Sequence, residues 1–252
     1  MLAIERRQQI ISRLTANGKV IVSELAEQFG VTEETIRRDL ERLDRDGIAS
    51  KTYGGAVSRH NSALDLPYNV REGVNVKEKQ HIAERCSELI ADGERIMLDS
   101  SSTALYIIKK LKDKKNLTII TNSVKILLEL QDKPDWTVLS TGGALKRGGL
   151  ALNGSSAEKM INSYHVDTAI FSCKGIDMAL GVTDSNENDS LIKQAMIASA
   201  ERKIIALDTE KFDKKSFVKF CELSDVDIIV TNSEPPEKWV SLLDELGIEL
   251  VY

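Results

Sequence analysis

Apolar residues recur every three or four positions along the first part of the chain, a spacing that predicts amphipathic helices. Three helices are expected there, over residues 5–16, 23–29 and 32–46. Ser23 and Thr32 stand at the starts of the second and third helices, where their side-chain oxygens can cap free backbone N–H groups. Gly47 ends the third helix, and two β-like segments follow around a bend at residues 53–55.

The pattern changes after residue 76, where short apolar runs alternate with helical stretches. Six of these runs are expected to be strands: residues 95–99, 117–121, 137–141, 166–173, 203–208 and 226–232. Strands that are apolar throughout and are separated by helices are typical of βαβ units, which form a parallel sheet buried on both faces. The fold class predicted for this part of the chain is therefore α/β.

These patterns divide the chain into two domains and a connection. Residues 59–76 contain Pro67 and Gly73 and show no regular period, so they are expected to be a linker. The linker separates a small N-terminal domain, residues 1–58, from a larger domain, residues 77–252.

The composition is that of an ordinary globular protein, with 42% hydrophobic and 29% charged residues. Cys86, Cys173 and Cys221 show no metal-binding spacing and are expected to be buried free thiols. The N-terminus lacks the apolar core of a signal peptide, and no apolar run approaches the ~18 residues of a membrane span. We therefore expect a cytoplasmic protein with no membrane segment, metal or cofactor.

The third helix of the small domain carries its arginines on one side. With Ile36 at the centre of the buried face, Leu40 and Leu43 lie close to it, and Arg38 lies nearly opposite. A lone helix with this pattern would most simply expose a solvated face. Here, however, two capped helices are joined by a glycine-containing turn, which is the helix-turn-helix arrangement that reads the major groove of DNA.

The β-like segments that follow are expected to form a wing beside the sugar-phosphate backbone. Arginine suits guanine and phosphate because its donors form a fork, and hydroxyl groups can hold phosphate. The residues expected to contact double-stranded DNA are Ser23, Thr32, Glu34, Thr35, Arg37, Arg38, Arg42, Lys51 and Tyr53.

This part of the chain resembles the N-terminal domain of DeoR-type bacterial transcription regulators. The stretch VTEETIRRDL fills the place of that family's recognition helix, and YGGA fills the place of its wing. Lys51 and Tyr53 stand where the family usually has arginine and histidine, which leaves the groove preference of the wing open. The resemblance implies a winged helix-turn-helix domain.

A run of hydroxyl residues follows the first predicted strand of the larger domain, in the sequence DSSST from Asp99 to Thr103. Hydroxyls and backbone N–H groups between a strand end and a helix N-terminus form a cradle for an anion. The same run could be an elaborate helix cap, but four consecutive hydroxyl residues exceed what a cap needs. The lysine and glycine spacing of a nucleoside triphosphate loop is absent from the sequence.

Other polar residues follow the remaining predicted strands. Ligands of open parallel sheets bind beyond the carboxyl ends of the strands, so these residues are expected to line one crevice. Lys193 and Lys211 could add positive charge there, or could be solvated. The residues expected to bind the effector are Asp99, Ser100, Ser101, Ser102, Thr103, Thr121, Asn122, Gly142, Gly143, Lys174, Gly175, Asp177, Lys193, Asp208 and Lys211.

Residues 76–235 resemble the effector domain of the same family, which is related in fold to ribose-5-phosphate isomerase. Ser101 replaces a glycine that is usual in the family's phosphate loop, and its Cβ is expected to reshape that loop. The resemblance implies a homo-oligomeric repressor of a carbohydrate-catabolism operon, controlled by a phosphorylated sugar. An activator of the same build remains an alternative.

A sugar-phosphate isomerase with an accessory DNA-binding head is a second alternative. That reaction needs a carboxylate base near the carbon beside the carbonyl group. When the chain is aligned by eye with the isomerase pattern, Ile192 stands where the base would be, and Met178 replaces another acid. Glu187 lies nearby in the sequence and could substitute. We therefore expect binding without turnover, and no catalytic residue.

Overall fold

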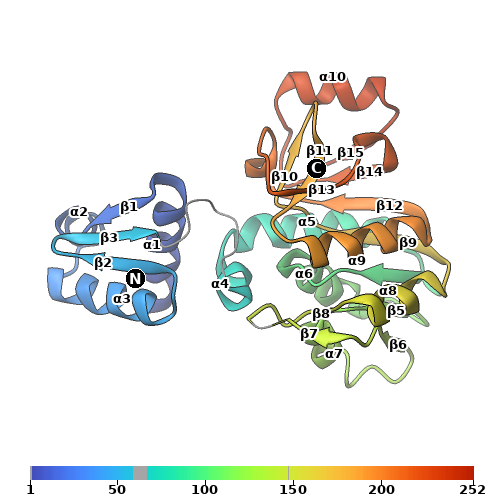
Figure 1. Ribbon diagram of the computed structural model, residues 1–252, viewed down its shortest axis with the longest axis horizontal. Coiled ribbons are helices and arrows are strands. Elements are labelled where there is room, and N and C mark those ends of the chain that lie inside the picture. Colours follow the sequence, from blue (N-terminus) through green and yellow to red (C-terminus); the bar gives the residue numbers. More distant parts are fainter. Residues whose placement is uncertain (1, 59–66, 147) are drawn as a thin grey trace. The chain divides into compact units, whose positions relative to one another are not determined.

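A computed structural model describes residues 2–58, 67–146 and 148–252 (Figure 1). The chain divides into two compact units, Met1–Val74 and Asn75–Tyr252. Of the expected linker, residues 59–66 lie outside the described residues, and the remainder contains the short helix α4 (Tyr68–Gly73). Val70 of α4 is buried in the hydrophobic core of the first unit.

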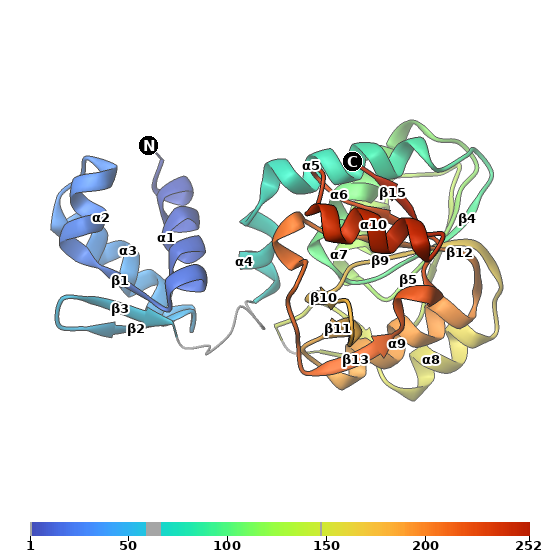
Figure 2. The same ribbon diagram turned by 90° about the horizontal axis from the view of Figure 1, so that it is seen from above.

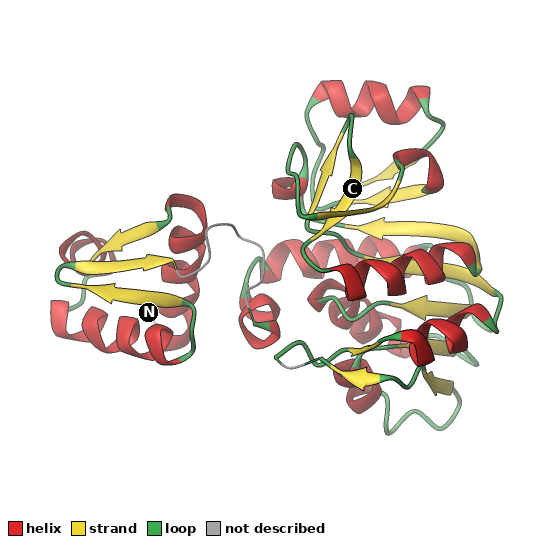
Figure 3. Ribbon diagram, in the orientation of Figure 1, coloured by secondary structure: helices red, strands yellow, loops and turns green. Residues whose placement is uncertain are grey.

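Besides α4, the described part of the first unit contains three helices and a three-stranded antiparallel sheet (Figure 3). The sheet has the order β1-β3-β2, and the β2–β3 hairpin is the wing. The elements are α1 (Ala3–Asn17), β1 (Lys19–Ile21), α2 (Val22–Phe29), α3 (Glu33–Arg45), β2 (Ala49–Thr52) and β3 (Gly55–Ser58). The predicted winged helix-turn-helix fold is confirmed.

The helix-turn-helix is held by the predicted apolar face of α3, by the predicted Thr32 cap and by a glycine at the end of α2. Ile36, Leu40 and Leu43 of α3 are all buried in the core of the unit. The side chain of Thr32 caps α3 by accepting a hydrogen bond from the backbone N of Thr35 at 3.3 Å. Gly30 ends α2 with φ of 62°, in the left-handed region that glycine adopts at little cost.

The prediction that Ser23 caps α2 is wrong, because the helix begins one residue earlier. Val22 is buried, and its backbone N donates a hydrogen bond to the carbonyl oxygen of Gly54 at 2.9 Å. These contacts bring Val22 into the first turn and leave Ile21 at the cap position, where it makes no side-chain cap hydrogen bond. Ser23 lies exposed in the first turn of α2.

The second unit is built on a seven-stranded parallel sheet of order β15-β14-β12-β9-β4-β5-β6. All six predicted strands belong to it, which confirms the predicted α/β class. The strands are β4 (Arg95–Leu98), β5 (Thr118–Thr121), β6 (Thr137–Ser140), β9 (Val166–Phe171), β12 (Ala200–Ala206), β14 (Ile228–Val230) and β15 (Glu249–Val251).

Helices cover both faces of this sheet, with α5 and α6 packed together on one face and α8 and α9 on the other (Figure 2). The helices are α5 (Val76–Glu88), α6 (Ser102–Lys110), α7 (Val124–Glu129), α8 (Ser155–Asn162), α9 (Glu187–Ala198) and α10 (Glu237–Glu245), with short 3-10 turns η1 (Leu111–Asp113), η2 (Thr209–Lys211) and η3 (Leu223–Asp225). Within the described residues, no helix is both long enough and apolar enough to span a membrane.

Two smaller sheets were not predicted. One is antiparallel and has the order β10-β11-β13, and the other is the β7–β8 hairpin. Their strands are β7 (Ala144–Leu145), β8 (Leu152–Asn153), β10 (Gly175–Asp177), β11 (Gly181–Asp184) and β13 (Val218–Cys221). The three cysteines are buried free thiols, as predicted.

Candidate functional site

The arginines expected to contact DNA project from the exposed side of α3. The side chain of Arg38 is 76% exposed, while Ile36 on the opposite side of the helix is completely buried. The side chains of Arg37 and Arg42 are more than half exposed. The core therefore fixes the rotation of α3 about its axis so that the arginines face solvent.

Each of these arginines lies beside an acid one helical turn away. Glu33 is 2.8 Å from Arg37, Glu34 is 3.4 Å from Arg38, and Asp46 is 3.2 Å from Arg42. Exposed pairs of this kind contribute only about 0.2–1 kcal/mol each, because water and salt screen them. The acids therefore hold these exposed arginines only weakly.

A different ion pair joins α3 to α1. The carboxylate of Asp39 lies 2.6 Å from Nε of Arg6 and 3.6 Å from the guanidinium of Arg7. Arg6 and Asp39 are both buried. Sequence reasoning missed this contact, because the RRD stretch gives no sign that its aspartate turns inward while its arginines turn outward.

The wing presents its own polar side chains. Lys51 on β2 lies 2.8 Å from Glu41 of α3, and Tyr53 at the tip is fully exposed. Gly55 is required by close packing, because a Cβ atom there would lie 2.0 Å from the carbonyl oxygen of Val20. The second glycine of the YGGA stretch therefore lets β3 lie against β1.

In the second unit, β5 and β6 lie on one side of β4 in the sheet, and the later strands β9, β12, β14 and β15 lie on its other side. Strand β4 lies between β9 and β5, so the position beyond its carboxyl end is a topological switch point, where ligands of such sheets usually bind. Asp99, immediately after β4, is 2% exposed. Its carboxylate accepts hydrogen bonds from the backbone N of Ser101 and of Ser172, both at 3.1 Å.

The hydroxyl residues after Asp99 lead directly into α6. Ser101 is the cap of this helix, and its Oγ accepts a hydrogen bond from the backbone N of Ala104 at 3.0 Å. The side chain that replaces the usual glycine therefore completes a helix cap. Ser102 and Thr103 are buried in the first turn, and Ser100 is half-buried.

Lys193 does not supply a free positive charge, because it lies between two carboxylates. Its Nζ forms a buried ion pair with Asp184 and lies 3.5 Å from Asp99. Burial would raise the pKa of Asp184, but the charge of Lys193 overcomes this and lowers the pKa below its ordinary value. Burial would lower the pKa of Lys193, but Asp184 and Asp99 raise it. Asp184 was not predicted as a site residue.

Lys211 lies at the edge of the group formed by Asp99, Asp184 and Lys193, which we call the Asp99 cluster. Its Nζ donates a hydrogen bond to Oγ of Ser172 at 3.2 Å and lies 3.5 Å from Asp208. Because the backbone N of Ser172 binds Asp99, the structure brings Asp99, Lys193, Asp208 and Lys211 together at the ends of β4, β9 and β12. Ser172 follows β9 directly, and only its place at a strand end could have identified it.

The predicted residues beyond β5 and β6 form a second polar group. Oγ1 of Thr121 donates to the carbonyl oxygen of Leu98, which ties it to the end of β4. The amide nitrogen of Asn122 lies 3.2 Å from Oδ1 of Asn153 on β8, and Asn153 in turn binds Asp189. Gly142 and Gly143 both have positive φ angles. A Cβ at Gly143 would lie 2.6 Å from the carbonyl oxygen of Asn153.

The predicted effector residues after β9, Lys174, Gly175 and Asp177, are only partly near the Asp99 cluster. Lys174 is half-buried, and its charge acts on Asp184. Asp177 instead accepts hydrogen bonds from the backbone of the β10–β11 turn and lies 3.3 Å from Lys215. Gly175 lies against the carbonyl oxygen of Lys214. Within the described part of the chain, these contacts of Asp177 include no member of the Asp99 cluster.

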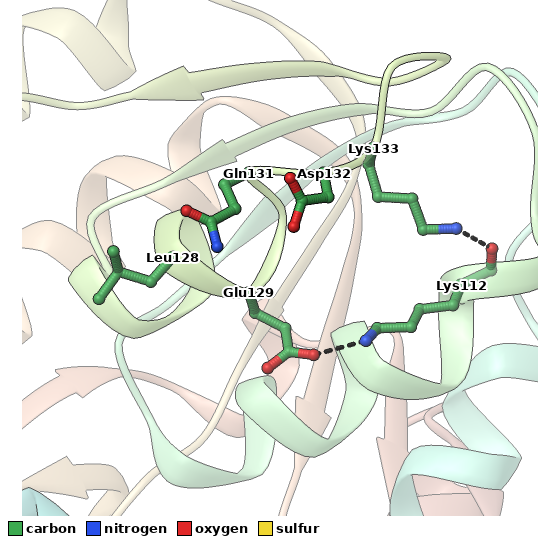
Figure 4. A pocket seen from close by; sticks show the side chains of 6 residues that line it. All are labelled: Lys112, Leu128, Glu129, Gln131, Asp132 and Lys133. Atoms are coloured by element: carbon green, nitrogen blue, oxygen red, sulfur yellow. Dashed lines mark hydrogen bonds and ion pairs between the residues drawn. The ribbon is translucent and has the colours of Figure 1, made fainter.

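A surface hollow of about 310 Å³ lies elsewhere on the second unit, between η1 and the end of α7 (Figure 4). Both of its lysines bind neighbours: Lys112 lies 2.6 Å from Glu129, and Lys133 donates to the carbonyl oxygen of Lys112. Its lining contains none of the predicted effector residues. No group of His, Cys, Asp and Glu side chains within the described residues is arranged to hold a metal ion.

Comparison with known proteins agrees with these two units. The family model for the DeoR-like helix-turn-helix domain matches residues 6–62, and the model for the DeoR C-terminal sensor domain matches residues 74–233. The chain therefore belongs to the DeoR family of helix-turn-helix, DNA-binding transcriptional regulators.

Two relatives are similar over nearly their whole length. An uncharacterized HTH-type transcriptional regulator, YulB of Bacillus subtilis, is 39% identical over 99% of this chain and 96% of its own. The glycerol-3-phosphate regulon repressor of Escherichia coli is 27% identical over 99% of both chains. Among solved structures, ribose 5-phosphate isomerase A of Methanocaldococcus jannaschii is 16% identical over 56% of each chain, with a TM-score of 0.42. A likeness of this size has no bearing on function.

Proposed function

We propose that the chain represses a carbohydrate-catabolism operon and that a phosphorylated sugar bound in its second unit controls operator binding. The observation that carries this proposal is the loop at the switch point of the sheet. Asp99 binds the backbone N of Ser101 and of Ser172, and the loop leads into the N-terminus of α6 beyond the carboxyl end of β4. A helix N-terminus with hydroxyl residues suits a phosphate group.

Lys211 is the cation best placed to meet such an anion. It is partly exposed, with 20% of its side chain accessible, and its partner Ser172 lies beside the Asp99 loop. Lys193 instead holds Asp99 and Asp184 in place, so it would organise the site without contacting the ligand. Asn122 and the Gly142–Gly143 turn would meet the sugar. One relative is named as the repressor of a glycerol-3-phosphate regulon, which supports a small phosphorylated effector.

Binding without turnover is supported by the surroundings of α9. Ile192, which stands at the place of an isomerase base in the sequence comparison, is buried in the hydrophobic core. Glu187, the possible substitute, is exposed in the first turn of α9. An assay of isomerase activity with pentose and hexose phosphates tests this part of the proposal, and turnover would contradict it.

In the first unit, the residues proposed to contact DNA are Ser23 and those on α3 and the wing, with Arg38 more exposed than Arg37 and Arg42. Thr32 and Thr35 lie at the N-terminal end of α3, where a recognition helix approaches bases and phosphates. One such unit contacts few base pairs, so strong specificity requires two half-sites and a homo-oligomer. A regulator of operators would act in the cytoplasm.

The effector can shift operator binding only by its different affinity for two conformations, commonly about 1–3 kcal/mol of coupling. A thermal-shift screen against sugar phosphates tests the effector, because a ligand that binds the folded state raises the melting temperature. Operator binding with and without the hit then tests the regulation. If no phosphorylated sugar changes either quantity, the proposed effector class is wrong.

A further inference from the structure

The helix proposed to enter the DNA groove carries more acidic than basic side chains. Residues 33–46 include six acids and four arginines. Asp39 is buried against Arg6, but Glu33, Glu34 and Glu41 are exposed. An exposed carboxylate is repelled by the phosphates of DNA, so the presence of several on this helix requires an explanation.

Two of these acids lie in the first turn of α3, the end that would approach the bases. Glu33 pairs with Arg37 at 2.8 Å and Glu34 with Arg38 at 3.4 Å. In both pairs the acid precedes the arginine by four residues, the order that is favourable on a helix. The two outward arginines are therefore already paired before any DNA is present.

Glu41 pairs with a basic side chain of the wing, Lys51. Its carboxylate accepts a hydrogen bond from Nζ of Lys51 at 2.8 Å, between α3 and β2. This hydrogen bond and the charge of Lys51 hold the pKa of Glu41 below its ordinary value, and the charges of Arg45 and Arg38 act in the same direction. The main cation of the wing is therefore also paired.

We propose that Glu33, Glu34 and Glu41 determine specificity by suppressing binding to DNA of arbitrary sequence. To contact a phosphate, each basic side chain must leave its carboxylate, and the carboxylate then lies near the DNA. On arbitrary sequence the chain exchanges one ion pair for another and gains little. On the operator, base contacts made only with the right sequence offset this cost. The inference rests on the proposed DNA-contacting surface.

Salt dependence gives a direct measure of this exchange. An arginine that binds phosphate releases a counterion from DNA, and affinity then falls with salt with a slope of about −0.9 per neutralised phosphate. A carboxylate that loses its arginine takes up a cation from solution, which reduces the net release of ions. Replacing these glutamates with glutamine should therefore make the salt dependence steeper.

The experiment compares the full chain with Glu33→Gln/Glu34→Gln and with Glu41→Gln. Binding is measured with a random-sequence duplex and with the best duplex selected from a random pool, between about 50 and 200 mM salt. We expect both variants to bind the random duplex more tightly, by about an order of magnitude for the double variant. The ratio of specific to non-specific affinity should fall.

Glu245→Gln in α10 is the matched control, because it makes the same charge change on an exposed residue of the other unit. Glu41→Gln also controls for the helix dipole, because residue 41 lies outside the first turn of α3. The inference would be overturned, and the proposed function left standing, by equal affinity of wild type and the α3 variants for the random duplex. An equal gain in that affinity in Glu245→Gln would have the same consequence. Failure of the wild type to bind any duplex would instead overturn the proposed function as well.

Discussion

Nε of Arg6 lies 2.6 Å from Oδ2 of Asp39, and this buried pair joins the first helix of the chain to its recognition helix. The aspartate follows directly after the two outward arginines of α3. The same three-residue stretch therefore contains the side chains proposed to contact DNA and the side chain that anchors their helix. Arg7, at 3.6 Å, is a second and more exposed partner of Asp39.

Removing Asp39 should destabilise the first unit. Asp39→Asn leaves the guanidinium of Arg6 buried without its counterion, which typically costs about 3–5 kcal/mol. Denaturant unfolding of the full chain, monitored for the first unit, measures this cost. The double variant Arg6→Met/Asp39→Leu should recover most of it, because apolar pairs of similar size often replace buried ion pairs without loss. A loss below about 1 kcal/mol in Asp39→Asn would show that the pair is not an anchor.

Replacing Arg38 should weaken operator binding while leaving the effector site intact. We expect Arg38→Ala to cost about 1–3 kcal/mol in operator affinity if the side chain contacts a base. The sugar-phosphate-induced thermal shift should be unchanged. Lys133→Ala in the second unit removes the same charge and serves as the control. Equal losses in both variants would mean that net charge alone matters.

Replacing Ser102 should have the opposite effect. Ser102 lies in the first turn of α6, and Ser102→Glu would place a carboxylate where the phosphate is proposed to bind. The variant should bind its operator but fail to respond to sugar phosphate, with the induced thermal shift lost. Ser102→Ala controls for removal of the hydroxyl, and the melting temperature without ligand reports any damage to the fold. A normal response in Ser102→Glu would exclude this loop as the phosphate site.

The Asp184–Lys193 pair should give the second unit a defined response to pH. The folded-state pKa of Asp184 is below its ordinary value of 3.8, so its contribution to stability is present above that value and lost as the pH falls through the folded pKa. Lys193 affects stability at alkaline pH, because its pKa in the folded state is raised. Its contribution to stability is present below the ordinary value of 10.5 and is lost as the pH rises through the folded pKa.

Lys193→Met should reverse the response at acid pH. Without the cation, burial dominates and raises the pKa of Asp184, so the ionised carboxylate becomes unfavourable. The variant should then gain stability, relative to the wild type, as the pH is lowered from 7 towards about 4. Melting temperatures of both proteins across this range measure the effect. Parallel curves would show that Lys193 does not set the ionisation of Asp184.

Periodicity and caps were enough to predict the helix-turn-helix and the parallel sheet, because both depend on local apolar spacing. Ile36, Leu40 and Leu43 are buried as their spacing requires, and Thr32 caps α3. The β10-β11-β13 sheet was missed because its strands, GID, GVTD and VKFC, mix apolar residues with glycine, lysine and aspartate and form no continuous apolar run.

By itself, the sequence determined the family, the α/β class and the outward direction of Arg38, since these follow from repeated local patterns and a specific motif. Only the tertiary structure decided which charges meet. Lys193 was expected either to add positive charge to the effector site or to be solvated, but it is enclosed by Asp184 and Asp99, and Asp39 turns inward to Arg6. Unlike the pairs one turn apart on α3, these ion pairs join side chains from different elements, and no local spacing encodes that proximity.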